Sequence, residues 1–155
     1  MMLKMIHAAP AKIPAKFSFI QEKEKKLETT IDRENVEQHF KTALVYYKKG
    51  DIKAAIEQNK TAITIIDRLQ DTELKARALS NLGYCYYQIS EYNQADGYFA
   101  KALSLYTKAQ QPKKVAATLN MLALTNKYWG KYQIALDYAQ KALEFNNYNL
   151  IAYQL

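Results

Sequence analysis

The sequence predicts an all-α protein made of three similar helix pairs. In the stretch SEYNQADGYFAKALSLY, small and large apolar residues recur at i, i+3, i+4 and i+7, the pattern of one face of an amphipathic helix. The same pattern occurs three times, and its anchoring residues Ala55, Ala95 and Ala135 keep a constant 40-residue period. Only four glycines and three prolines are present, which leaves little material for long loops.

Residues 1–34 precede the repeated pattern and are expected to form an arm or linker, partly disordered. Residues 1–20 include three lysines and no acid, with prolines at 10 and 14 that interrupt any helix. A targeting segment is one interpretation of this basic stretch. A flexible arm, or a segment packed over the first repeat, is the other. The following QEKEKKLETT is typical of a charged helix or linker.

Residues 35–147 contain the repeats, at about 36–70, 76–110 and 116–147. The first helix of each pair carries one small residue, Ala43, Gly83 or Ala123, at equivalent positions. The second helix carries two, and Ala62, Ala102 and Ala142 form the later set. Small residues at fixed positions indicate where neighbouring helices approach closely.

The breaks between helices are predicted from capping residues. Gly50 and Gly130 suit the left-handed conformation that ends many helices, and Asp51 and Ser90 are good N-caps for the second helices. Asp71 and the Gln111-Pro112 pair, one period apart, predict the starts of the next first helices, since proline is tolerated in the first turn.

Residues 148–155 read NLIAYQL after Tyr148 and are apolar, whereas the ends of helical repeat arrays are normally polar. Three alternatives remain open for this segment. It is a cap folded over the last helix, the start of a truncated fourth repeat, or a face that binds a partner or a second copy of the chain.

The small residues of the three repeats resemble the pattern of the tetratricopeptide repeat family, which has small residues at the eighth, twentieth and twenty-seventh places of each unit. The resemblance covers roughly residues 36–147 and implies an α-solenoid, a right-handed superhelix of three helix-turn-helix repeats. The usual unit has about 34 residues; the 40-residue unit is similar to a bacterial subset. The prolines common after the second helix are replaced by Asp67, Thr107 and Asn147.

The family resemblance implies that the first helices line a concave groove that binds a peptide. Its expected contact residues combine aromatic, basic and amide side chains: Phe40, Leu44, Tyr47, Lys48, Arg77, Tyr84, Tyr87, Asn120, Lys127 and Tyr128. Most of the 13 tyrosines are instead expected to serve helix packing, among them Tyr46, Tyr86, Tyr92 and Tyr132. A groove tyrosine could equally stack on a neighbour and bind nothing.

One specialised ligand of the family is not predicted. Members that bind the C-terminal carboxylate of chaperones use lysines, asparagines and an arginine on the first helices. Asn81 occupies one such place, but Phe40 and Leu44 stand where lysine and asparagine are needed, and Ala117 and Met121 replace the third repeat's basic pair. The chaperone tail is therefore not an expected partner.

Two other functions remain as alternatives. The net charge of +7 and the aromatic groove allow single-stranded RNA binding, although most lysines lie outside the groove and nucleic acid is the less favoured partner. Long-unit repeats also resemble the peptide-sensing part of bacterial regulators, but the segment 1–34 is too short and irregular for a helix-turn-helix output domain.

No catalytic, metal or cofactor motif is present in the sequence. His7 and His39 have no partner at metal-binding spacing, so His39 is expected to be structural, and Cys85 is expected to be a packed hydrophobe. The sequence therefore predicts a non-enzymatic adaptor that needs no cofactor. No run approaches the ~20 apolar residues of a membrane span, and a single cysteine fits a reducing, cytoplasmic environment.

Overall fold

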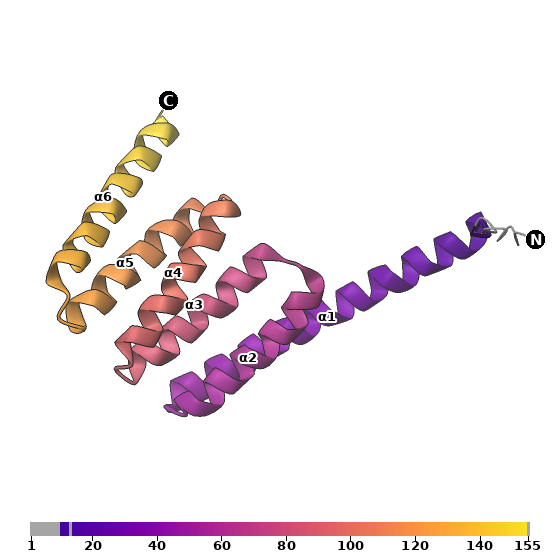
Figure 1. Cartoon of the computed structure of the whole chain (residues 1–155), viewed down its shortest axis with the longest axis horizontal. Helices are drawn as coiled ribbons and strands as arrows, with labels where there is room; N and C mark the ends of the chain where they lie inside the picture. The colour runs from indigo at the N-terminus through magenta and orange to yellow at the C-terminus, as the bar shows by residue number, and fades with distance from the viewer. Residues whose placement is uncertain (1–9, 13, 155) are drawn as a thin grey trace, which may run out of the picture.

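The computed structural model describes residues 10–12 and 14–154, with side chains described as far as Asn147. Six α-helices follow one another along the chain (Figure 1). They are α1 (Ala15–Lys49), α2 (Ile52–Leu69), α3 (Thr72–Gln88), α4 (Tyr92–Lys108), α5 (Pro112–Tyr128) and α6 (Tyr132–Gln154). No strand occurs among the described residues.

Each helix packs against the next, which confirms an all-α solenoid of helix-turn-helix repeats. Helices α2, α4 and α6 begin at Ile52, Tyr92 and Tyr132, which keep the 40-residue period. Figure 1 shows the pairs stacked one after another, with the long α1 projecting at one end. Among the described residues, no helix is long and apolar enough to cross a membrane.

The small residues lie at the helix contacts, as expected. Ala55, Ala62, Ala95 and Ala102 are fully buried. They allow the helices to approach closely while larger side chains such as Phe99 fill the space around them. The core is therefore continuous from pair to pair, and each pair depends on its neighbours for burial.

Most predicted helix boundaries are confirmed. Gly50 and Gly130 adopt the left-handed conformation, with φ of 81° and 83°. The Asp51 carboxylate accepts a hydrogen bond from the Ala54 N–H, and Asp71 does the same for Leu74. Pro112 occupies the first turn of α5.

The N-cap predicted at Ser90 is wrong. The N-cap of α4 is Glu91, and Ser90 has φ of 62°. Ser90 stands one period from both Gly50 and Gly130, so the chain needs the same left-handed turn there even without a glycine. The Ser90 backbone carries the strain that glycine avoids at the other two turns.

The described ends of the chain continue the neighbouring helices. Helix α1 starts at Ala15, so the later part of the expected arm is helical and joins the first repeat helix without a break. Neither glycine nor proline occurs between residues 15 and 49 to end the helix earlier. Similarly, the backbone of residues 148–154 extends α6. Residues 1–9, and His7 with them, lie outside the described residues.

Tyr132 does not serve helix packing, contrary to expectation. Its side chain is 72% exposed, whereas Tyr46, Tyr86 and Tyr92 are partly buried. Tyr92 packs against Tyr128, which the following helix pair supplies. Among the described residues, no helix follows α6 to supply an equivalent of Tyr128, so the Tyr132 ring has no aromatic neighbour of this kind.

Candidate functional site

A pocket of about 400 Å³ opens between α1, α2 and α3. Five of its lining residues are predicted groove residues, and four are not. The predicted ones are Phe40, Leu44, Tyr47, Arg77 and Tyr84; the others are Ala43, Asn59, Asn81 and Cys85. Apolar and aromatic side chains thus form the walls, with one guanidinium and two carboxamides among them.

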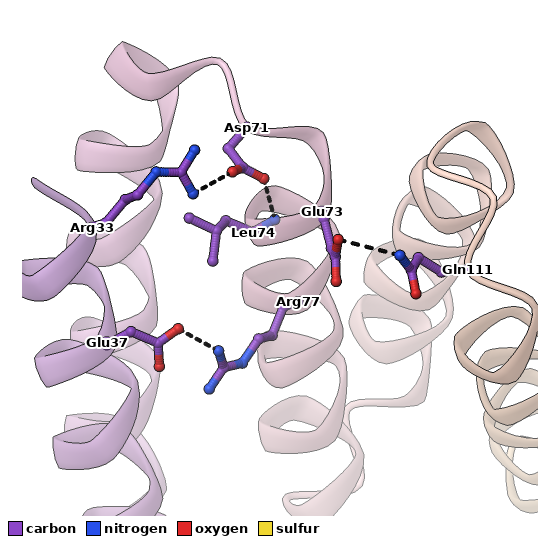
Figure 2. Close-up of polar contacts among 7 residues, drawn as sticks. All are labelled: Arg33, Glu37, Asp71, Glu73, Leu74, Arg77 and Gln111. Carbon is purple, nitrogen blue, oxygen red and sulfur yellow. Dashed lines mark hydrogen bonds and ion pairs between the residues drawn. The ribbon is translucent and has the colours of Figure 1, made fainter. Parts of the chain in front are cut away.

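Arg77 lies at the boundary between this pocket and a charged surface. Its guanidinium stacks on the Phe40 ring, 4.4 Å from the centroid. It also donates a hydrogen bond of 2.6 Å to Glu37 Oε1, which Figure 2 shows. The stacking covers Phe40, which is only 4% exposed although the sequence predicted an accessible groove residue. Phe40 therefore contributes a pocket wall beneath Arg77.

Two carboxamides are held in place at the base of the pocket. Asn59 is buried; its Nδ2 donates to the Ala55 carbonyl, and its Oδ1 accepts a 3.1 Å hydrogen bond from Asn81 Nδ2. Both side chains line the pocket. A carboxamide can both donate and accept hydrogen bonds, so this pair can recognise a peptide group or a polar side chain.

The two phenols and the thiol of the pocket favour their neutral forms. Burial raises the pKa of Tyr47, and the nearby Cys85 raises it further. Burial also raises the pKa of Tyr84, and the nearby Tyr47 adds to that effect. Burial raises the pKa of the Cys85 thiol to about 11. Neutral phenols donate hydrogen bonds without charge, whereas a protonated, buried thiol is a poor nucleophile.

The remaining predicted groove residues lie beyond the pocket. Tyr87 and Tyr128 pack edge to face, with centroids 6.0 Å apart, and Tyr92 completes this aromatic group. Lys127 Nζ lies 5.6 Å from the Tyr128 ring centroid. The Tyr47 hydroxyl donates a long hydrogen bond of 3.4 Å to Gln88 at the edge of the pocket. Lys48 and Asn120 are exposed and do not line the pocket.

Sequence reasoning missed Asn59 because it lies on a second helix of a pair. Its equivalents one and two periods later are Phe99 and Ala139. An asparagine among the apolar positions of α2 was the available signal. The polar residue at this position creates the hydrogen-bonded base of the pocket in the first repeat, where the second repeat has a buried ring.

Polar contacts join successive first helices, as Figure 2 shows. Arg33 Nη1 lies 2.7 Å from Asp71 Oδ2, and Gln111 Nε2 donates to Glu73 Oε2 at 3.3 Å. Residues 73 and 111 stand one period after residues 33 and 71, so these are the same contact in consecutive repeats. The polar contact between first helices is therefore repeated along the array. Its first copy is formed by Arg33 of α1.

Asp71 combines this contact with its capping role. Partial burial raises the pKa of its carboxyl, but hydrogen bonds from the Leu74 N–H and Arg33, together with the Arg33 charge, outweigh burial and hold the pKa below its usual value. The ionised carboxylate therefore stabilises both the start of α3 and its contact with α1.

The histidine of α1 and the acidic side chains do not form a metal centre in the part of the chain that the structure describes. His39 is partly buried and its Nδ1 lies 2.8 Å from Gln58 Oε1, which fits the structural role expected of it. Among the described residues, no group of three or more histidine, cysteine, aspartate or glutamate side chains could hold a metal ion.

Comparison with known families agrees with this architecture. A sequence model described as tetratricopeptide repeat matches residues 39–108 and 74–147, which together span most of the chain. The chain belongs to the tetratricopeptide repeat family. Repeats of this family generally mediate protein–protein interaction, and its members are typically non-enzymatic scaffolds. No curated protein matches the sequence.

Solved structures show that the tetratricopeptide fold is shared. The tetratricopeptide repeat domain of Arabidopsis FLU is 15% identical with a TM-score of 0.69, over 73% of this chain and 95% of that one. BtubC (BKLC) from P. vanneervenii is 16% identical with a TM-score of 0.41, over 72% of this chain and 63% of that one. At such identities only the FLU similarity is informative, and it concerns the fold alone.

Proposed function

We propose that this tetratricopeptide repeat protein is a non-catalytic adaptor that binds an extended peptide segment along its first helices. The pocket between α1, α2 and α3 receives an apolar side chain of the peptide. One observation carries the proposal: five predicted groove residues from two first helices converge on a single pocket of about 400 Å³. A volume of this order is typical of a ligand pocket, so it can hold a large apolar side chain together with the peptide groups beside it.

The chemistry of the walls supports an apolar anchor with polar groups beside it. Leu44 is exposed at the pocket and contributes apolar surface, while Tyr84 presents a ring edge-packed on Phe99 at 5.2 Å. Rings fixed by packing lose little entropy on binding. Asn81, held by Asn59, is placed to hydrogen-bond the peptide backbone next to the anchor.

The charges around the pocket favour a peptide over RNA. Arg77, the one basic side chain among the residues that line the pocket, is paired with Glu37 at 2.6 Å. A phosphate chain would have to compete with that carboxylate, and nucleic-acid binding depends on basic groups available to phosphates. Because Arg77 is paired with Glu37, the carboxamides and the tyrosines provide the hydrogen bonds to the peptide groups.

A selection experiment tests this function. The purified chain is presented with a random peptide library, and a pool of single-stranded RNA is tested in parallel at low and moderate salt. Enrichment of peptides that share a large apolar residue is the expected result. Retention of RNA that weakens steeply with salt, without enriched peptides, would contradict the proposal and favour RNA binding.

A further inference from the structure

Helix α1 contains a segment that has no counterpart in the other first helices. Helix α3 begins at Thr72, which stands one period after Asp32. Residues 15–31 therefore precede the repeat unit and form an extension of almost five helical turns. Figure 1 shows this extension running away from the array, with no other helix beside it.

The extension carries an exposed apolar stripe. Phe17, Ile20, Leu27 and Ile31 are all exposed. Together with Glu24 they are spaced alternately three and four residues apart, the spacing of the a and d positions of a coiled coil. In this heptad assignment the a positions are 17, 24 and 31, and the d positions are 20 and 27.

The stripe faces away from the chain's own array. Within the array, α1 buries Val36, Phe40 and Ala43 against its neighbours. Continued toward the N-terminus at 3.6 residues per turn, that face carries the polar residues Thr29 and Lys25. The apolar stripe lies on the opposite side of the helix, so the array cannot cover it and a second helix can approach without meeting the array.

The charges of the extension indicate which kind of partner its apolar stripe can bind. Between residues 15 and 31 there are four basic and three acidic residues, a net charge of +1, although the whole chain carries +7. A nearly balanced segment is only weakly attracted to an anionic surface such as a lipid headgroup layer. In a parallel pair in register, Lys23 at a g position lies opposite Glu28 of the partner subunit at the following e position, an attractive contact formed twice.

We propose that residues 15–31 pair with the same segment of a second copy of this chain, in a short parallel two-stranded coiled coil. The two arrays then lie on the outer sides of the pair, with their grooves available. Glu24 brings two carboxylates together at an a position, and the seam spans only about two heptads. The dimer is therefore weak and dissociates on dilution.

Sedimentation equilibrium of the full chain over a concentration series, up to the millimolar range, tests the proposal. The average mass is expected to rise from 17.9 kDa toward twice that value. The double variant Ile20→Glu with Leu27→Glu removes both d positions and is expected to remain monomeric. Ser18→Glu with Lys25→Glu is the control, because both residues are exposed on the extension but stand at b positions, off the seam.

Two further variants test the details of the pair. Glu24→Leu is expected to tighten the dimer. Lys23→Glu is expected to weaken it, and the added Glu28→Lys change to restore it. A mass of 17.9 kDa at every concentration would overturn the proposal, as would a dimer that survives Ile20→Glu with Leu27→Glu. Unchanged thermal unfolding of the array confirms that the variants are folded.

Discussion

Gly83 lies directly beneath the ring of Phe99. A Cβ atom added at Gly83 would stand 2.7 Å from two carbons of that ring, well inside van der Waals contact. Ala43 and Ala123 occupy the equivalent position in the other repeats, where Asn59 and Ala139 stand in place of the phenylalanine. The glycine of the second repeat is therefore explained by the buried phenylalanine opposite it.

Gly83→Ala is expected to lower the free energy of unfolding by about 1 kcal/mol. Overpacking a core costs roughly 1–3 kcal/mol, which exceeds the ~1 kcal/mol that alanine gains over glycine in a helix. Gly97→Ala is the matched control, because nothing lies within 4 Å of an added Cβ there, and it should stabilise the protein. Urea unfolding measures both. Equal stabilisation by the two changes would show that the Phe99 ring does not confine position 83.

Ala95→Leu is expected to destabilise the protein by about 1–3 kcal/mol, because Ala95 is fully buried at the contact between helices and the added atoms have no space. The thermal midpoint should fall while the far-ultraviolet circular dichroism of the folded state is retained. An unchanged midpoint would contradict the helix register that places Ala95 in the core.

The Asp71 carboxylate is expected to make stability depend on pH. Its pKa is lower in the folded chain than the usual value of 3.8, so its contribution is complete above 3.8 and is lost as the pH falls through the folded pKa. Asp71→Asn retains a good N-cap but removes the charge. Its denaturation midpoint should decline less than that of the parent between neutral pH and pH values below 3.8. Parallel declines would exclude this role of Asp71.

Cys85 is expected to react slowly in the folded protein. Burial raises the pKa of its thiol to about 11, so little thiolate is present at mildly alkaline pH. Iodoacetamide should modify the native chain far more slowly than the chain unfolded in urea, with the difference followed by mass. Equal rates would contradict both the burial and the raised pKa.

The 40-residue register made most of the fold predictable from the sequence. It places Ala55 and Ala95 in the core, and the period between Asp71 and Gln111 sets where α3 and α5 begin. Such features depend on local capping and on which residues share a helix face. The break at Ser90 was predicted, but Ser90 was assigned as the N-cap because serine is a common one, and only its alignment with two glycines shows that the backbone requires a positive φ.

The site was less predictable, because its properties come from contacts between helices. The groove pattern places Phe40 among the accessible residues of α1, but the ring is buried in the core cluster with Val36 and Ala62, and Arg77 covers it from the next helix pair. The pairing of Arg77 with Glu37 likewise depends on side-chain conformations that periodicity does not fix. Asn59 contributes from α2, outside the helices from which the groove was predicted.

Peptide affinity of Leu44→Ser, compared with Val45→Ser, tests the groove most directly. Both residues lie on α1 and are similarly exposed, at 52% and 49%, but only Leu44 lines the pocket between α1, α2 and α3. With a selected peptide and isothermal titration calorimetry, Leu44→Ser should weaken binding at least tenfold, about 1.4 kcal/mol, while Val45→Ser retains the parent affinity. Equal affinity of both variants and the parent would show that the pocket is not where the peptide binds.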